Sequence, residues 1–329
     1  MTTEAIPFPT RRPPGYEWFD EEPVFDPAIH LDLQPPTEKT YLVDLGYSSD
    51  EIATKSTPIA ASSAYRILSD HGAAALAESA RRLRSHATAC ERIDTMVRGG
   101  VYRSKFLRDL CLDPSLTEMM CDIFESDVAP HTMPVHLGHL NFEPDTVDKA
   151  VDKWHHDTLP CDFVMMVTDP ASIDGGEFEY FHGTKEEMAK LAADGVSPPR
   201  DRVVAPDLRG PGWAVALHGD MVVHRAAPLH QPGERITMVN GYVATDTTLD
   251  EQARSIDLIG VDDHETLFTE WARHAAWRAA GRLDHLIGSL EFTADRDAVV
   301  AELNSAIADV QQAVEDMYPP DDHSMAHYE

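Results

Sequence analysis

The sequence has little positive charge. Its 329 residues include 27 Lys and Arg against 57 Asp and Glu, which gives a formal net charge of −30. Such an excess of negative charge repels nucleic acid and acidic membrane surfaces, so neither is an expected partner. There is no run of about 18 apolar residues that would span a membrane, and the first residues (MTTEAIPFPTRRPPGYEWF) lack the apolar segment of a secretory signal. We therefore expect a soluble, cytoplasmic protein.

Cysteine is also scarce. The four cysteines are Cys90, Cys111, Cys121 and Cys161, and no two of them have the CxxC spacing. A disulfide framework and a cysteine-rich zinc site are therefore not expected, and the thiols are expected to be reduced and buried. Metal chemistry in this chain would have to come from histidines and carboxylates.

What remains is the composition of an ordinary globular protein, with 43% hydrophobic and 26% charged residues. The chain is long enough to bury a sizeable core. We predict one compact domain with four parts. These are an extended N-terminal arm (1–60, rich in Pro and acidic residues), a helical flank (61–130), a β core (131–246) and a C-terminal helical region (247–329).

Helix signals are clear in the predicted flank. Ser69 and Asp70 precede AAALAESARRLRSHA, which is rich in helix-forming Ala and Arg. A second helix is expected to begin at Asp113-Pro114, because Pro is favoured at the first position of a helix and the following LTEMMCDIF carries an apolar stripe.

The middle of the chain changes from helical periodicity to short β-rich segments separated by Gly, Pro and Asp turns. Together with a strand around His155, these make eight strands, the number in a double-stranded β-helix (jelly roll, cupin-like). The predicted fold class is therefore a mainly β core with flanking helices. An inserted helix and loop are expected at 183–200, near the mouth of the pocket. The other strands are predicted at 133–142, 160–168, 176–182, 202–206, 212–218, 221–226 and 235–244.

Two histidines and one aspartate form a candidate metal site. In His155-His156-Asp157 the alternation of a strand places His155 and Asp157 on one face and His156 on the other. His224 follows on a later strand. Two histidines and a carboxylate hold one face of an iron(II) ion and leave the opposite face open for a co-substrate and O2. An HxD triplet alone is weak evidence, and His218 and His230 are rival third ligands that we expect in a turn and a loop.

Arg235 adds a candidate anchor for a dicarboxylate. It opens the strand after His224, and its planar, permanently charged fork suits the far carboxylate of 2-oxoglutarate. Thr237 lies on the same face of that strand and offers a hydroxyl to the same carboxylate. Asn141, on strand 133–142, is a further candidate for holding 2-oxoglutarate or substrate.

The segments WHHDT, DGGEFEYF, GDMVVHRAAP and GERIT, within 130–246, resemble the iron(II)/2-oxoglutarate-dependent oxygenase superfamily. The motif is most similar to bacterial hydroxylases and halogenases of free amino acids. The resemblance implies His155, Asp157 and His224 as catalytic iron ligands and Arg235 as the 2-oxoglutarate anchor, with O2 as co-substrate. Halogenating members carry Gly or Ala in place of the carboxylate, so Asp157 disfavours halogenation.

The implied activity is a dioxygenase that oxidises an unactivated C–H bond of a small molecule, plausibly an amino acid or a natural-product intermediate. The outcome is hydroxylation, desaturation or cyclisation, which the sequence does not distinguish. Two alternatives stay open. One is a non-haem iron oxidase that does not use 2-oxoglutarate, although Arg235 would then need another partner. The other is a non-catalytic cupin-like metal-binding protein, which the complete set of ligands disfavours.

An apolar stripe follows the last predicted helix, where Leu303, Ile307, Val310, Val314 and Met317 repeat at alternating steps of four and three. Two interpretations remain. The stripe either packs against the outside of the β core or forms a homodimer contact.

Overall fold

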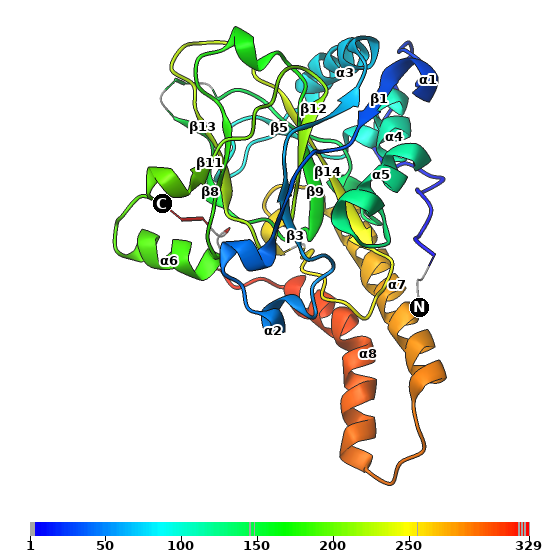
Figure 1. Ribbon diagram of the computed structural model, residues 1–329. Coiled ribbons are helices and arrows are strands. Elements are labelled where there is room, and N and C mark those ends of the chain that lie inside the picture. Colours follow the sequence, from blue (N-terminus) through cyan, green and yellow to red (C-terminus); the bar gives the residue numbers. More distant parts are fainter. Residues whose placement is uncertain are drawn as a thin grey trace.

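The computed structural model describes residues 4–144, 146–147, 149–254, 256–321, 323, 325 and 327–328. Within these residues the body consists of two antiparallel sheets with flanking helices (Figure 1). The larger sheet has ten strands. Its main order is β1 (Leu31–Gln34), β4 (Tyr65–Leu68), β12 (Trp213–Leu217), β9 (Cys161–Met166), β14 (Thr237–Ala244), β7 (His139–Asn141) and β5 (Met96–Val97); β2 (Lys39–Tyr41), β3 (Ile59–Ser62) and β6 (Val128–Pro130) pair beside this path.

The smaller sheet has four strands in the order β11 (Val203–Val204), β10 (Phe178–Phe181), β13 (His224–Pro228) and β8 (Ala150–His155). Its inner face packs on the larger sheet through one apolar cluster, in which Phe178 and Tyr180 meet Val164 and Val215. Phe178 and Val164 also line the cavity between the sheets. This packing therefore sets the spacing of the two walls of the cavity.

All eight predicted strands overlap observed strands, but three boundaries differ where candidate site residues lie. Asp157 follows the end of β8 and is held by a hydrogen bond from its N–H to the carbonyl of Gly219 (2.9 Å). His224 begins β13 because residues 218–222 form a turn. Arg235 precedes β14, and its N–H donates to the side chain of Glu143.

The N-terminal half contains more β structure than expected. Strand β1 pairs with β4, and β2 pairs with β3, so the first 68 residues extend the larger sheet. The predicted arm also contains two short helices, α1 (Pro27–His30) and α2 (Ser49–Ile52). Tertiary pairing outweighed the weak local signals here, because a four-residue strand carries too little alternation to stand out in a sequence.

Three helices cover the outer face of the larger sheet. The two predicted ones are present as α3 (Asp70–Leu83) and α5 (Pro114–Phe124), and both start at the expected caps, Ser69 and Asp113. The third, α4 (Lys105–Cys111), was not predicted. Their apolar side chains form the main core with the outward residues of the central strands, including Leu76, Phe106, Leu116, Phe163 and Tyr242.

The expected insertion is a helix, α6 (Lys185–Ala193), capped by Thr184. Its position differs from the prediction. Met188 packs with Trp154, Phe181 and Val223 on the outer face of the smaller sheet, and no residue of 183–200 lines the cavity. The insertion therefore supports the strand that carries His155 from behind instead of forming the mouth of the pocket.

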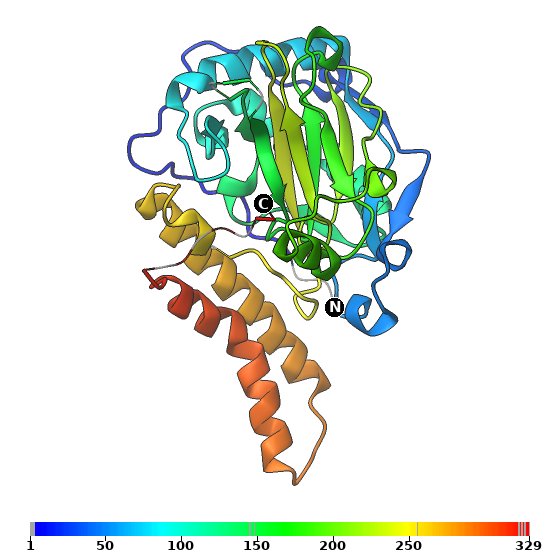
Figure 2. The ribbon, with the colours of Figure 1, turned by 90° about the vertical axis from the view of Figure 1, so that its left-hand side faces the viewer.

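The C-terminal helices α7 (His264–Ser289) and α8 (Arg296–Asp316) form an antiparallel hairpin that projects from the body (Figures 1 and 2). The first half of α7 packs on the body through Leu267 and Trp271, which meet Met133 and Val135. The stripe on α8 does not pack on the sheets: Leu303, Ile307, Val310 and Val314 are 37–59% exposed. Met317 alone among the five joins the core under the hairpin.

The four cysteines form no disulfides, and Cys111 and Cys161 are buried. No helix in the described part of the chain is long and apolar enough to cross a membrane.

We predict that Trp271→Ala destabilises the protein by about 3–5 kcal/mol, because the indole is 3% exposed and truncation leaves a cavity between α7 and the body. Urea unfolding checks this. Val300→Ala on exposed α8 is the control and should change stability by about 0.5 kcal/mol or less. Equal effects of the two substitutions would contradict the packing described for α7.

Candidate metal centre

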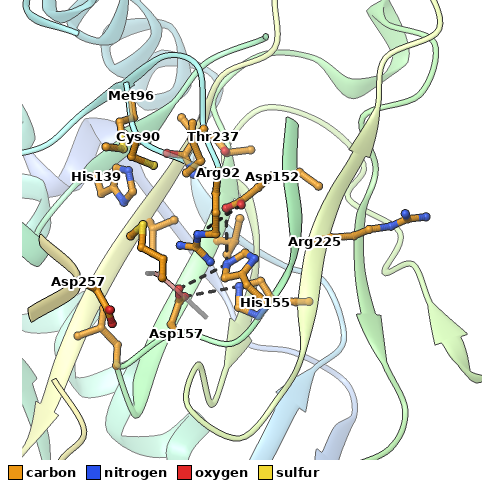
Figure 3. Close-up of a pocket in the computed structure, with 18 of the residues that line it drawn as sticks. Cys90, Arg92, Met96, His139, Asp152, His155, Asp157, Arg225, Thr237 and Asp257 are labelled. Atoms are coloured by element: carbon orange, nitrogen blue, oxygen red, sulfur yellow. Dashed lines mark ion pairs between the residues drawn. The ribbon is translucent and has the colours of Figure 1, made fainter. Parts of the chain in front are cut away.

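A cavity of about 140 Å³ lies between the two sheets (Figure 3). Strands of both sheets supply its walls, and residues of two further segments also line it, among them Arg92 and Arg98 in one and Asp257 and Leu258 in the other. All six candidate site residues from the sequence line it: His155, Asp157, His224, Arg235, Thr237 and Asn141.

The predicted metal ligands converge at one point in this cavity. The Nε2 atom of His155 lies 3.4 Å from Oδ1 of Asp157, and the Nε2 atom of His224 lies 3.5 Å from Oδ2. One ligand atom from each of the three residues lies within 4.8 Å of the other two. The arrangement has the residue types and the one-sided layout that suit a ferrous ion. That they bind one remains a prediction.

Backbone hydrogen bonds fix the protonation of both imidazoles. Nδ1 of His155 lies 2.6 Å from the carbonyl of Lys153, and Nδ1 of His224 lies 2.9 Å from the carbonyl of Val222. A carbonyl only accepts, so each Nδ1 must carry the proton and donate it. The Nε2 atom of each neutral ring then has a free lone pair that faces Asp157, as metal ligation requires.

The electrostatics match this assignment. Burial and the charge of Arg92 lower the pKa of His155, so its ring is neutral at neutral pH. Hydrogen bonds and charge from His155 and His224 would hold the pKa of Asp157 well below its usual range only if their Nε2 atoms carried protons. With both Nε2 atoms bare, a bound cation would stabilise the carboxylate instead. Burial and the nearby Asp157 raise the pKa of Asp162 well above its usual range, which leaves Asp162 neutral.

Strand pairing brings the ligands together. His224 is the direct partner of His155 in the antiparallel pair of β13 and β8. Asp157 is placed by its hydrogen bond to Gly219, a residue with no room for a side chain: an added Cβ would lie 2.6 Å from Asp162 Oδ2 and 2.7 Å from the carbonyl of Leu159. The Gly219-Asp220 turn is therefore part of the support for the site.

Arg235 is buried in the cavity wall, at 1% exposure, without an ion pair to any described carboxylate. Its Nε donates to the carbonyl of Gly176 (2.7 Å), and one terminal nitrogen lies 3.5 Å from Oγ1 of Thr237. Burial lowers its pKa to about 10, so it stays charged at neutral pH. A buried cation without a counter-ion is costly, and this one faces a cavity that a carboxylate could enter.

Gly176 explains the paired glycines of DGGEFEYF. Its φ is +77°, in the left-handed region that favours glycine, and an added Cβ would lie 2.9 Å from Cδ of Arg235. The same residue offers its carbonyl to Arg235. Gly176 therefore leaves room for the side chain of Arg235 and accepts a hydrogen bond from it.

Asn141 and Thr237 are direct partners in the pair of β7 and β14, so both lie beside Arg235. The Oδ1 atom of Asn141 is buried without a partner in the described part of the chain. Such an atom costs free energy unless a ligand pairs with it. This supports a binding role for Asn141, which stays a prediction.

The rival ligands lie elsewhere. His156 turns away from the metal group and its Nδ1 contacts the hydroxyl of Tyr328 (2.8 Å). His230 is exposed in its loop. His218 borders the turn, as expected; it is fully buried and does not line the cavity.

A second group of two histidines and one carboxylate exists among the described residues: His131, Glu251 and His274. Its hydrogen bonding is opposite to that of the first. Nδ1 of His131 accepts from the N–H of Met133 (3.1 Å), and burial lowers the pKa of His131 to about 3. The neutral ring must then carry its proton on Nε2, so His131 has no free lone pair on either nitrogen. This cluster is therefore not arranged to hold a metal ion.

Several cavity residues were missed by the sequence analysis. Arg92 and Arg98 enter from the loop after α3, Asp152 comes from β8, and Met325 comes from the C-terminal segment. No spacing rule links these positions to the metal motif, because they reach the cavity through the path of the chain. Asp152 and His155 lie three residues apart, so strict alternation would place them on opposite faces of β8. A register shift between β13 and β8 lets both line the cavity.

The chain was compared with known proteins. No family model and no curated protein matches it. Similar solved structures include the non-heme alpha-ketoglutarate-dependent epimerase SnoN from nogalamycin biosynthesis (15% identity, TM-score 0.42, 62% of this chain and 82% of that chain). EctD from S. alaskensis with 2-oxoglutarate and 5-hydroxyectoine is another (16%, 0.42, 72% and 89%). HygX from Streptomyces hygroscopicus with nickel and 2-oxoglutarate bound is a third (13%, 0.40, 61% and 88%). These TM-scores are too low to assign a family, so the function is inferred from this chain's own side chains.

We predict that Gly176→Ala weakens binding of 2-oxoglutarate by about tenfold, because the added Cβ displaces Arg235 and strains the backbone. Iron(II) affinity should not change. Calorimetry with the metal and then with 2-oxoglutarate measures both. Gly260→Ala, where an added Cβ meets open space, is the matched control. Loss of metal binding in Gly176→Ala, with dicarboxylate binding intact, would contradict the role given to Gly176.

Proposed function

We propose that this protein is an iron(II)/2-oxoglutarate-dependent oxygenase that oxidises a C–H bond of a small molecule. One observation carries the proposal. Two imidazole lone pairs and a carboxylate converge in a cavity whose wall also contains a buried guanidinium, that of Arg235, without an ion pair to a described carboxylate. The metal group suits iron, and the guanidinium suits the far end of a dicarboxylate.

In this proposal His155, Asp157 and His224 hold iron(II) and leave its cavity side open. Arg235, with Thr237 beside it, binds the distal carboxylate of 2-oxoglutarate. The bound iron supplies the oxidising chemistry, in which O2 converts 2-oxoglutarate to succinate and CO2 while a substrate C–H bond is oxidised. The residues of the chain orient the two co-substrates and decide which hydrogen faces the metal.

The fold supports the same proposal. We interpret the two facing antiparallel sheets as the halves of a double-stranded β-helix within one compact domain. We take β7 to β14 as the eight core strands. Strand β8 carries His155, β13 carries His224, and Asp157 follows the end of β8. In this interpretation the N-terminal strands and the helices are additions that brace the core.

The small volume of the cavity, about 140 Å³, favours a small substrate over a polymer. Its walls alternate polar ligand groups with apolar side chains such as Val164, Phe178 and Leu258, which exclude water from the space beside the metal group. An amino acid or a natural-product intermediate fits this setting, and hydroxylation, desaturation and cyclisation all remain open. The acidic charge of the chain agrees with a soluble, cytoplasmic enzyme that does not bind nucleic acid.

Two alternatives make different predictions. A 2-oxoglutarate-independent iron oxidase has no use for a buried Arg235 without a counter-ion, which is why we rank it second. A cupin-like metal-binding protein would hold the metal without consuming 2-oxoglutarate.

We predict that the aerobic protein with iron(II) slowly converts 2-oxoglutarate to succinate even without substrate, and that Asp157→Ala lowers this rate at least about a hundredfold because the ion loses its only anionic ligand. Succinate release measures the rate. His230→Ala, at an exposed loop histidine, should leave it unchanged. Metal binding without succinate release in the wild type would favour the alternatives.

We also propose that the protein forms a homodimer through the projecting hairpin of α7 and α8. The exposed stripe of α8 (Leu303, Ile307, Val310 and Val314) is apolar, so an identical stripe related by a two-fold axis is a suitable cover. A charged partner would gain nothing from it.

We therefore predict a dimer in light scattering after gel filtration, and a monomer for Ile307→Asp, because the substitution places a charge in the buried seam. Gln311→Asp, an exposed position on the same helix, should remain dimeric. A monomeric wild type at micromolar concentration would remove this part of the proposal.

A further inference from the structure

Five arginines line the cavity, and four of them have clear partners within the described residues. Arg235 donates to the carbonyl of Gly176, as described above. The other three form ion pairs with carboxylates on the cavity rim or outside it: Arg98 with Asp262 (2.9 Å), Arg225 with Glu179 (2.7 Å) and Arg254 with Asp316.

Arg92 is different. Its side chain is only 11% exposed, and the nearest carboxylate oxygen, Oδ1 of Asp152, lies 3.9 Å from its Nε, too far for a hydrogen bond. The Nε atom is buried without a partner among the described residues. A guanidinium has five N–H donors, and leaving them unpaired in a buried site is costly. The Nε–H of Arg92 is therefore available to an acceptor that enters the cavity.

Asp152 places Arg92 beside the metal group. While Oδ1 of Asp152 faces Arg92, its Oδ2 lies 3.5 Å from Nε2 of His155, the atom proposed to bind iron. Figure 3 shows the guanidinium of Arg92 between Asp152 and His155, pointing toward Asp157. Arg92 therefore faces the position where a ligand of the metal would sit.

We propose that Arg92 binds a carboxylate of a molecule held at the metal, in a subsite separate from Arg235. This inference rests on the proposed function. Two molecules offer that chemistry: 2-oxoglutarate, through the C1 carboxylate that chelates the metal, and a carboxylate-bearing substrate beside it. The planar fork of Arg92 matches a carboxylate, and the loose contact with Asp152 is easily exchanged for one.

The test compares two chelators on the anaerobic iron(II) protein. 2-Oxoglutarate reaches both the metal and Arg235, whereas oxalate chelates the metal and is too short to reach Arg235. Affinities are measured by calorimetry for wild type, Arg92→Met, Arg92→Lys and Arg235→Met. Arg225→Met is the control, because Arg225 also lines the cavity but its guanidinium extends away from the metal group and pairs with Glu179 (Figure 3). Circular dichroism confirms that each variant is folded.

If Arg92 binds the chelating carboxylate, Arg92→Met weakens both ligands by about tenfold or more, and Arg92→Lys weakens them less. Arg235→Met should weaken 2-oxoglutarate alone. If the carboxylate belongs to the substrate, both chelators bind Arg92→Met normally. Carboxylic acids and amino acids that stimulate succinate release in wild type then fail to stimulate Arg92→Met.

Unchanged affinity for both chelators, together with no acid in the panel that separates wild type from Arg92→Met, would overturn the inference. Failure of the proposed function has a different signature. In that case the wild-type protein itself does not bind 2-oxoglutarate, and both proposals fall together. If the wild type binds 2-oxoglutarate and Arg92→Met behaves identically, only the role of Arg92 is rejected.

Discussion

The site depends on one hydrogen-bond pattern that occurs twice. His155 and His224 each donate Nδ1–H to the carbonyl of the residue two positions earlier in the chain. The bond fixes the tautomer, orients the ring and leaves the Nε2 lone pair facing Asp157. The cluster of His131, Glu251 and His274 has similar residue types and spacing, but its bond to His131 runs the other way. The direction of a backbone hydrogen bond therefore indicates which of the two clusters can bind a metal ion, and residue composition does not.

The rest of the cavity is organised around buried cations. The chain as a whole is strongly acidic, yet its central cavity contains Arg235, which has no ion pair to a described carboxylate, and Arg92, whose nearest carboxylate oxygen (Asp152) lies 3.9 Å away. Folding tolerates this because α6, the outer helices and the core cluster hold the two sheets in place around them. Binding of an anionic co-substrate would recover the free energy that these buried cations cost.

Much of the site could be predicted because its residues lie on strands or directly beside strand ends. His155, His224 and Thr237 lie on strands, Asp157 and Arg235 lie within two residues of one, and all five line one cavity. Arg92 and Met325 could not be predicted, because the path of distant loops decides their positions. Asp152 was hidden by the register shift in β8, and the 183–200 insertion was misplaced because a helix signal does not say which face of a sheet the helix covers. The short N-terminal strands were missed because pairing, not local pattern, creates them.

The most direct test of the central claim is an anaerobic titration of the iron(II)-loaded protein with 2-oxoglutarate, followed by visible absorption. Chelation of ferrous iron by the 2-oxo acid gives a weak charge-transfer band. We expect this band in the wild type and its loss in His224→Ala, whose metal site lacks one imidazole. Iron bound without a band in the wild type would contradict the account and leave a metal-binding protein or an oxidase that does not use 2-oxoglutarate.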